Sequence, residues 1–162
     1  AGHQVRANPL YGPERRGAPV ASFLRISPEI IRVKCQIYQP DCVVVLDARL
    51  PQTVPVLDGL REGGMALFNQ SQPQGGLSDL ERVGRLAWVD ATAIAKEILG
   101  SSITNTTMIG AFARICDLVS MKTIEKAIKR TFSDPSQGEA NFRAAQRAYE
   151  HCELRVLHGP RR

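Results

Sequence analysis

Short apolar runs alternate with amphipathic segments through the middle of the chain. Residues 42–47 have the sequence Cys-Val-Val-Val-Leu-Asp, and a short apolar run with β-branched residues is typical of a strand covered on both faces. Residues 65–69 and 84–89 predict two more strands, whereas residues 53–62 and 91–99 carry apolar side chains at helical spacing. The alternation predicts an α/β fold: a three-layer domain with a mostly parallel sheet flanked by helices.

The beginning of the chain is rich in glycine and proline and predicts loops with short extended pieces. Strands are predicted at residues 4–7 and 21–26, followed by a further extended segment at residues 29–37. Later in the chain, the polar stretch at residues 70–84 predicts a loop with a short helical turn.

The C-terminal half predicts helices. The predicted helices cover residues 105–118, 120–132 and 139–154. Pro135 and Gly138 are expected to separate the second helix from the third. We expect a single domain over residues 1–154. A basic tail, frayed or bound to a partner, is expected over residues 155–162.

Composition and charge narrow the class of protein. With 162 residues, 43% of them hydrophobic and 23% charged, the chain has a globular balance and is long enough to bury a core. The formal net charge is +5, and the basic excess lies at Arg15-Arg16 and in the tail. Neither is a long Lys/Arg run with interleaved aromatic residues, so we expect no nucleic-acid partner. An acidic partner or a phosphorylated cofactor explains a basic loop equally well.

The cysteines and histidines give no metal-binding pattern. Cys35, Cys42, Cys116 and Cys152 show no CxxC spacing, and the three histidines do not cluster with them, so we expect no zinc or iron–sulfur cluster on this chain alone. Serine and cysteine nucleophiles lack a neighbouring histidine motif, and no catalytic residue is assigned. No apolar stretch approaches the roughly 18 residues of a membrane span, and a signal-peptide pattern is missing, which favours a soluble, cytoplasmic protein.

The most distinctive stretch is the loop Tyr11-Gly-Pro-Glu-Arg-Arg-Gly-Ala-Pro-Val20. Glycines bracket it and prolines stiffen it, and rigid loops that display charge are good recognition surfaces. Guanidinium groups match both carboxylates and phosphates. The alternative is that the acidic residue pairs with one arginine and the loop only closes the sheet edge. The candidate partner- or cofactor-contact residues here are Tyr11, Gly12, Glu14, Arg15, Arg16 and Gly17.

A second group of candidates follows the predicted strands or begins a predicted helix. Asn105 and Thr106 stand at a helix start, where backbone N–H groups attract anions, although plain capping by Asn105 is the simpler interpretation. We expect Ile109 on the inward face of that helix. Asp90 is best explained as a helix cap, and Asp47 is a weak site candidate at the edge where α/β sheets place their sites.

Several segments resemble gamma subunits of the pyruvate and branched-chain 2-oxoacid:ferredoxin oxidoreductase family. The loop at 11–20 with the strand ending in Arg25-Ile26 carries the resemblance. Matching segments in the same order are Val89-Asp-Ala-Thr-Ala-Ile-Ala, Asn105-Thr-Thr-Met-Ile-Gly-Ala-Phe112, Leu118-Val-Ser and Ala148-Tyr-Glu150. Together they span nearly the whole chain.

This resemblance implies a subunit without a catalytic centre of its own. Enzymes of the family oxidatively decarboxylate a 2-oxoacid to an acyl-CoA with thiamine diphosphate and coenzyme A, and pass electrons through iron–sulfur clusters to ferredoxin. The implied partners are alpha, beta and ferredoxin-like delta subunits or domains, which hold the thiamine diphosphate and the clusters. The gamma subunit is expected to support assembly and the approach of coenzyme A, through Arg15 and Arg16.

Two other classes of function stay open at this point. A stand-alone nucleotide- or phosphate-binding α/β domain would need a glycine-rich strand–turn–helix unit, which these residues do not show. A nucleic-acid-associated protein would use the basic loop and tail, with a steep salt dependence of binding.

Members of the family resembled here begin with a strand and a glycine-rich GxGGQG turn leading into a helix. This sequence lacks that unit, and a doubly wound sheet without its first strand would leave ladder groups unpaired. We therefore expect that the unit precedes residue 1 in the native protein. Mass spectrometry of the native protein tests this: a mass of 17.8 kDa with a start at Ala1 would contradict it.

Overall fold

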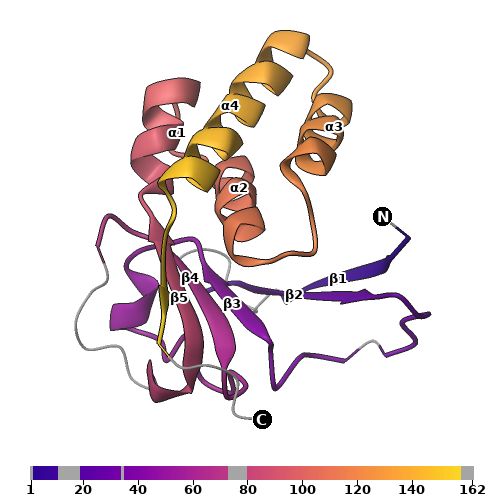
Figure 1. Cartoon of the computed structure of the whole chain (residues 1–162), viewed down its shortest axis with the longest axis vertical. Coiled ribbons are helices and arrows are strands. Elements are labelled where there is room, and N and C mark those ends of the chain that lie inside the picture. The colour runs from indigo at the N-terminus through magenta and orange to yellow at the C-terminus, as the bar shows by residue number, and fades with distance from the viewer. Residues whose placement is uncertain (1, 11–18, 34, 73–79, 158–162) are drawn as a thin grey trace. The chain divides into compact units, whose positions relative to one another are not determined.

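The computed structural model describes residues 2–10, 19–33, 35–72 and 80–157. They belong to two compact units, Ala1–Gln39 and Pro40–Arg162. Both units are shown in Figure 1, and each is described by itself. The predicted loop over 11–18 lies outside the described residues.

The first unit is built on a hairpin. β1 (Gln4–Leu10) pairs antiparallel with β2 (Ala21–Ser27), with Gln4 opposite Ser27 and Leu10 opposite Ala21. Both strands were predicted, and each is longer than expected.

The extended segment expected at 29–37 joins neither strand in its described residues, so that prediction was wrong. Carbonyl groups of this segment accept hydrogen bonds from arginine side chains instead of from a neighbouring strand. Arg6 donates to Ile31 O (3.3 Å), and Arg25 donates to Cys35 O (2.7 Å) and Gln36 O (3.1 Å).

The second unit contains a sheet with the strand order β3-β4-β5-β6. β3 (Cys42–Val45), β4 (Gly64–Asn69) and β5 (Val83–Val89) run parallel, and β6 (Glu153–Val156) is antiparallel to β5. The mostly parallel sheet of an α/β fold is thus confirmed.

The end of the sheet corrects one expectation. Arg155 and Val156 were assigned to a frayed tail, but they pair with Leu86 and Arg85 in β5, and the guanidinium of Arg155 lies 5.3 Å from the centre of the Trp88 ring. The domain end predicted after Leu154 therefore falls inside β6. Residues 158–162 of the predicted tail lie outside the described part.

Alternate residues of the central strands enter two different hydrophobic clusters. Leu67 and Ala87 pack with the helices, together with Met108, Ala111 and Ala148. The residues on the opposite face of the same strands, Ala66, Phe68, Leu86 and Trp88, pack with Leu57 and Leu60. Burial on both faces explains why these strands are mostly apolar, with the exposed Arg85 as an exception in β5, instead of alternating with polar residues.

The layer opposite the helices contains turns where a helix was predicted. The expected helix over 53–62 was wrong: a short 3₁₀ helix, η1 (Leu50–Gln52), is followed by turns. Pro55 cannot donate a helical hydrogen bond, and Gly59 has a φ of 73°, which ends any helical path. The apolar spacing nevertheless identified buried residues, since Leu57 and Leu60 are 2% and 0% exposed.

Four α-helices occupy the other side of the described unit (Figure 1). They are α1 (Ala91–Leu99), α2 (Asn105–Ile115), α3 (Met121–Thr131) and α4 (Pro135–His151). The predicted cap of α1 is confirmed, since Asp90 accepts from Ala93 N. In α3 the cap is Ser120, whose side chain accepts from Thr123 N. Gly100 ends α1 at a φ of 65°, as expected for a left-handed C-terminal residue.

Two helix predictions need correction. Pro135 and Gly138 were expected to separate helices, but α4 begins at Pro135 and continues through Gly138. Proline is tolerated in the first turn of a helix because the N–H that it lacks would have no helical partner there. Asp134 is the N-terminal cap, and its side chain accepts a hydrogen bond from Ser136 N. In α2, Ile109 was expected to face inward, yet it is 45% exposed, and its neighbour Met108 is 2% exposed. The buried face of α2 therefore includes Met108 in place of Ile109.

α2 packs tightly against α4 at Gly110. A Cβ atom at this position would lie 1.8 Å from the carbonyl oxygen of Ala145, and Ala145 itself is fully buried. A backbone carbonyl cannot move aside as a flexible side chain does. The glycine in mid-helix thus has a packing reason.

We predict that Gly110→Ala lowers the free energy of unfolding by about 1–3 kcal/mol, because α2 and α4 must separate to admit the methyl group. Gly138→Ala is the matched control, since its Cβ would meet nothing closer than 3.7 Å. That change should stabilise by about 0.5–1 kcal/mol through helix propensity. Urea unfolding of both variants measures the difference, and equal stabilities would contradict the close crossing.

Candidate functional site at the carboxyl edge of the sheet

The site residues expected from the sequence fall into two groups. Those of the loop, Tyr11, Gly12, Glu14, Arg15, Arg16 and Gly17, lie outside the described residues. Asn105 and Thr106 begin α2, as expected. The helix cap is Thr104, which makes no side-chain capping bond, so plain capping by Asn105 was wrong. Both residues stay candidates for contact with a ligand or partner.

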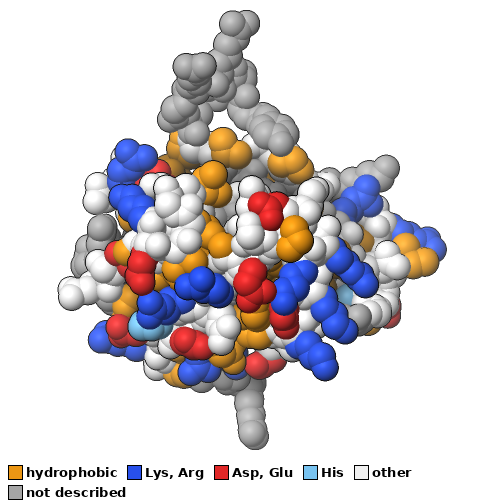
Figure 2. Space-filling view, turned by 90° about the horizontal axis from the view of Figure 1, so that it is seen from above, with side chains coloured by type: hydrophobic (Ala, Val, Ile, Leu, Met, Phe, Trp, Pro, Cys, Tyr) orange, Lys and Arg blue, Asp and Glu red, His pale blue; other side chains and the backbone are white. Residues whose placement is uncertain are grey.

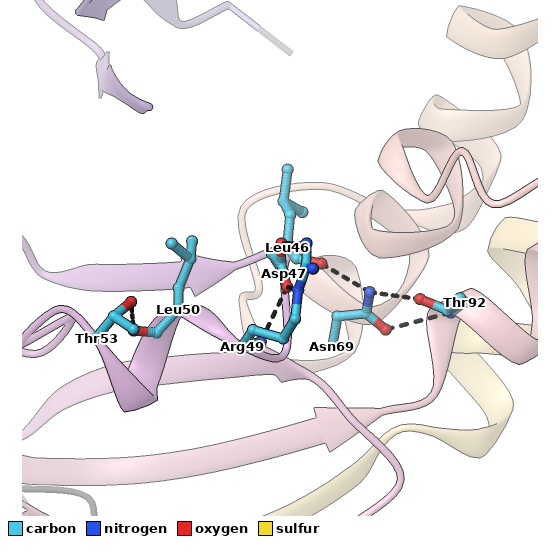
Figure 3. A network of polar contacts seen from close by, with 7 residues as sticks. All are labelled: Leu46, Asp47, Arg49, Leu50, Thr53, Asn69 and Thr92. Atoms are coloured by element: carbon cyan, nitrogen blue, oxygen red, sulfur yellow. Dashed lines mark hydrogen bonds and ion pairs between the residues drawn. The ribbon is translucent and has the colours of Figure 1, made fainter. Parts of the chain in front are cut away.

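Polar side chains gather where the parallel strands end. Asp47 follows β3, Asn69 ends β4 and Asp90 follows β5. The carboxyl ends of parallel strands meet at one edge, which is where open α/β sheets bind ligands. Figure 3 shows the residues around Asn69 and Asp47 at this edge.

Asn69 bridges three elements at this edge. Its side chain is almost fully buried, and its Nδ2 donates to Leu46 O at 2.7 Å and to Thr92 Oγ1 at 2.9 Å. Its Oδ1 accepts from Thr92 N at 3.2 Å. One amide therefore connects the end of β3, the end of β4 and the first turn of α1 (Figure 3).

Asp47 is held within its own loop by Arg49. Its Oδ1 accepts from Arg49 N at 2.9 Å and from Nε at 3.1 Å, and its Oδ2 accepts from Nη2 at 2.8 Å. Hydrogen bonds from the Arg49 side chain, then from its backbone, lower the pKa of Asp47 to about 2. A carboxylate with so low a pKa is a poor proton acceptor at neutral pH, so Asp47 is suited to ordering the loop.

The first turn of α1 is already supplied with acceptors. Asp90 Oδ1 accepts from Ala93 N at 2.8 Å, and Thr92 N donates to Asn69. These two N–H groups are thus not available to a bound anion. The interpretation of Asp90 as a helix cap is confirmed.

Gln70 places a buried acceptor beside this network. Its backbone N–H donates to Val89 O at 2.9 Å, and the residue is 7% exposed. Within the described residues its Oε1 has no hydrogen-bond partner. A buried amide oxygen of this kind accepts a hydrogen bond from any donor that reaches it, whether a water, a ligand hydroxyl or another chain.

Three cysteines lie in the helix-side core. Cys116 and Cys152 are buried there, and Cys42 packs against the same cluster. Burial raises the pKa of Cys42 to about 12, with Cys116 and Asp41 adding to the effect, and burial raises the pKa of Cys152 to about 11. These two thiols stay protonated at neutral pH, as suits packing residues.

The described part of the chain holds neither a cluster of metal-ligating side chains nor a helix that could span a membrane. Residues 2–10, 19–33, 35–72 and 80–157 contain no group of three or more His, Cys, Asp or Glu side chains placed to hold a metal ion. None of the helices in these ranges is long and apolar enough to cross a membrane.

The sequence interpretation missed Asn69, Gln70 and Thr92. The first two follow the apolar run Met65–Phe68 directly, which is the same position relative to a strand that singled out Asp47 and Asp90. A polar residue directly after a predicted parallel strand therefore indicates a site residue, whether it carries an amide or a carboxylate. Only the carboxylates of Asp47 and Asp90 were considered at such positions.

Comparison with known proteins gives consistent relatives. The family model described as pyruvate ferredoxin/flavodoxin oxidoreductase matches residues 1–151. The common gamma subunit of the pyruvate/ketoisovalerate oxidoreductases of Pyrococcus furiosus is 48% identical over 155 residues, which cover 94% of this chain and 83% of that protein. The pyruvate synthase subunit PorC of Methanocaldococcus jannaschii is 43% identical over 148 residues, covering 91% of this chain and 80% of that protein.

Solved structures give the same result. The pyruvate oxidoreductase subunit PORC of Thermotoga maritima has a TM-score of 0.78 at 34% identity, covering 94% of this chain and 82% of that chain. The gamma subunit of a keto/oxoacid ferredoxin oxidoreductase of Geobacter sulfurreducens has a TM-score of 0.68 at 24% identity, covering 93% of this chain and 80% of that chain, which shows a shared fold.

We predict that Asn69→Ala lowers the free energy of unfolding by about 1–3 kcal/mol, because Leu46 O and Thr92 N lose their partner in a buried place. Asn141→Ala is the control: that amide donates to Gln137 O on the surface of α4, and its loss should change stability by no more than about 0.5 kcal/mol. Thermal and urea unfolding compare the two. A similar small effect at both positions would show that the Asn69 network does not hold the edge together.

Proposed function

This chain belongs to the pyruvate ferredoxin/flavodoxin oxidoreductase family as a gamma-type subunit, and from that premise we propose that it is a non-catalytic subunit that supports assembly of a 2-oxoacid oxidoreductase. The resemblance seen in the sequence motifs is thereby confirmed. The observation that carries the proposal is the match over nearly the whole chain to gamma subunits, in sequence and in fold.

The proposed complex oxidatively decarboxylates pyruvate or a branched-chain 2-oxoacid to an acyl-CoA. The names of the archaeal relatives support this substrate class. Thiamine diphosphate and iron–sulfur clusters would be held by alpha, beta and ferredoxin-like delta subunits, and ferredoxin would accept the electrons. The protonated thiols of Cys42 and Cys152 support a packing role for these two cysteines.

The finer part of the proposal concerns coenzyme A. Arg15 and Arg16 stand in the sequence between β1 and β2, and Leu10 at the end of β1 pairs with Ala21 at the start of β2. Guanidinium groups form paired hydrogen bonds with phosphate oxygens, and coenzyme A carries several phosphates. We infer that these two arginines bind phosphate groups of coenzyme A as it approaches the complex.

A strand–glycine turn–helix unit outside these 162 residues would complete the sheet at β3. Among the described residues β3 pairs only with β4, and its other edge leaves Val44 39% exposed and the adjoining Leu46 45% exposed. An unpaired edge strand with exposed apolar side chains is a template for a further strand. The relatives are longer than this chain, which covers 80–83% of them.

The direct test is purification of the tagged protein from its native source, followed by a viologen- or ferredoxin-linked assay with several 2-oxoacids. We expect recovery of thiamine- and cluster-bearing subunits with activity toward at least one 2-oxoacid. Recovery of the chain alone, inert toward every 2-oxoacid, would contradict the proposal and favour a stand-alone nucleotide- or phosphate-binding domain.

For the coenzyme A role, we predict that Arg15→Ala/Arg16→Ala raises the Michaelis constant for coenzyme A about tenfold or more, because two charge-assisted contacts are lost. The Michaelis constant for the 2-oxoacid should not change. Arg32→Ala/Arg82→Ala, which removes two exposed arginines elsewhere, is the matched control. Unchanged coenzyme A kinetics in an intact complex of the Arg15/Arg16 variant would refute this role.

A further inference from the structure

The outer surface of α3 carries a row of basic side chains. Lys122, Lys126 and Arg130 are exposed and four residues apart, so they lie along one ridge of the helix. We call these three residues the α3 ridge. Figure 2 shows the surface seen from above the helices, where Lys and Arg side chains are spread among acidic and apolar ones.

The ridge differs from its neighbour Lys129 in having no counter-charge. Lys129 Nζ lies 2.7 Å from Glu125 and 3.2 Å from Glu139, and 5.8 Å from the centre of the Phe142 ring. No carboxylate of the described residues forms an ion pair with Lys122, Lys126 or Arg130. Lys129 therefore fastens α3 to α4, and the ridge does not contribute to that contact.

The placement of the ridge works against the stability of α3. Like charges four residues apart repel each other on a helix. Lys122 lies in the first turn, which has no acidic residue and where the helix dipole disfavours a cation. An acidic partner would remove both costs.

The chemistry of the ridge fits a transient partner better than a permanent one. Its charges are on long, exposed side chains, and the residues between them, Thr123 and Ala127, offer little apolar area. Permanent subunit interfaces have an apolar core, while weak electron-transfer encounters are small, polar and guided by charge.

We propose that the α3 ridge is a docking surface for an acidic electron-carrier protein, the ferredoxin or flavodoxin class of the family description. The inference rests on the proposed function, since it needs a complex that passes electrons to such a carrier. The ridge raises the encounter rate by attracting carboxylates of the carrier and exchanges no electrons itself.

The test uses the purified whole complex carrying Lys122→Gln/Lys126→Gln/Arg130→Gln in this subunit. Two acceptors are compared at low ionic strength: a purified ferredoxin of net negative charge, and methyl viologen, a small cationic dye. The matched control, Arg32→Gln/Arg82→Gln/Lys96→Gln, removes the same number of exposed charges from other elements.

We expect kcat/KM for ferredoxin to fall about tenfold or more in the ridge variant, with the viologen rate unchanged and the control like the wild type. The dependence of kcat/KM on ionic strength should also become shallower. An unchanged ferredoxin kcat/KM would overturn the proposal, and so would an equal loss with viologen, which would assign the ridge to assembly.

Two further outcomes separate this inference from the proposed function. A wild-type complex that reduces viologen but not ferredoxin would overturn the docking surface and leave the proposed function standing. Inactivity of the wild type with every 2-oxoacid would overturn both. Binding of double-stranded DNA that is lost in the ridge variant would identify nucleic acid as the occupant and reject the electron carrier.

Discussion

Burial of β4 and β5 on both faces is the constraint on which the second unit depends. Each face needs its own cover, so Leu67 and Ala87 require the helices, and Phe68 and Trp88 require the turns around Leu57 and Leu60. The hydrophobic effect is non-directional, so it requires that each apolar face be covered but does not determine which secondary structure covers it. The form of each cover is decided locally, which is why one face received α-helices and the other received turns.

That two-sided burial also explains the polar network at the carboxyl edge. Buried backbone groups at the ends of such mostly apolar strands need hydrogen-bond partners, and polar side chains at the strand ends supply them. Asn69 does this for two elements at once by accepting from Thr92 N and donating to Leu46 O. The edge is therefore a rigid support, with Gln70 Oε1 as a buried acceptor beside it.

The sequence predicted the parts of the fold in which local pattern and tertiary environment agree. The strands at 65–69 and 84–89 and the cap Asp90 follow from residue type alone. It failed at 53–62, where apolar spacing identified buried residues but Pro55 and Gly59 decided the backbone, and at Pro135, which begins a helix instead of separating two. For the site, only the carboxylates were noticed, because the role of Asn69 depends on three elements meeting in space.

The distribution of positive charge separates structural from interactive residues. Arg25, Arg85 and Lys129 donate to carbonyl or carboxylate oxygens of their own unit, and their charges serve the fold. Lys122, Lys126 and Arg130 have no such use, although Glu125 and Glu139 show that α3 and α4 accommodate acidic residues where pairing is needed. In α3, Lys129 is paired with two carboxylates, whereas the three cations of the α3 ridge are exposed. The helix would be more stable with those three charges paired, which is consistent with a partner that supplies carboxylates.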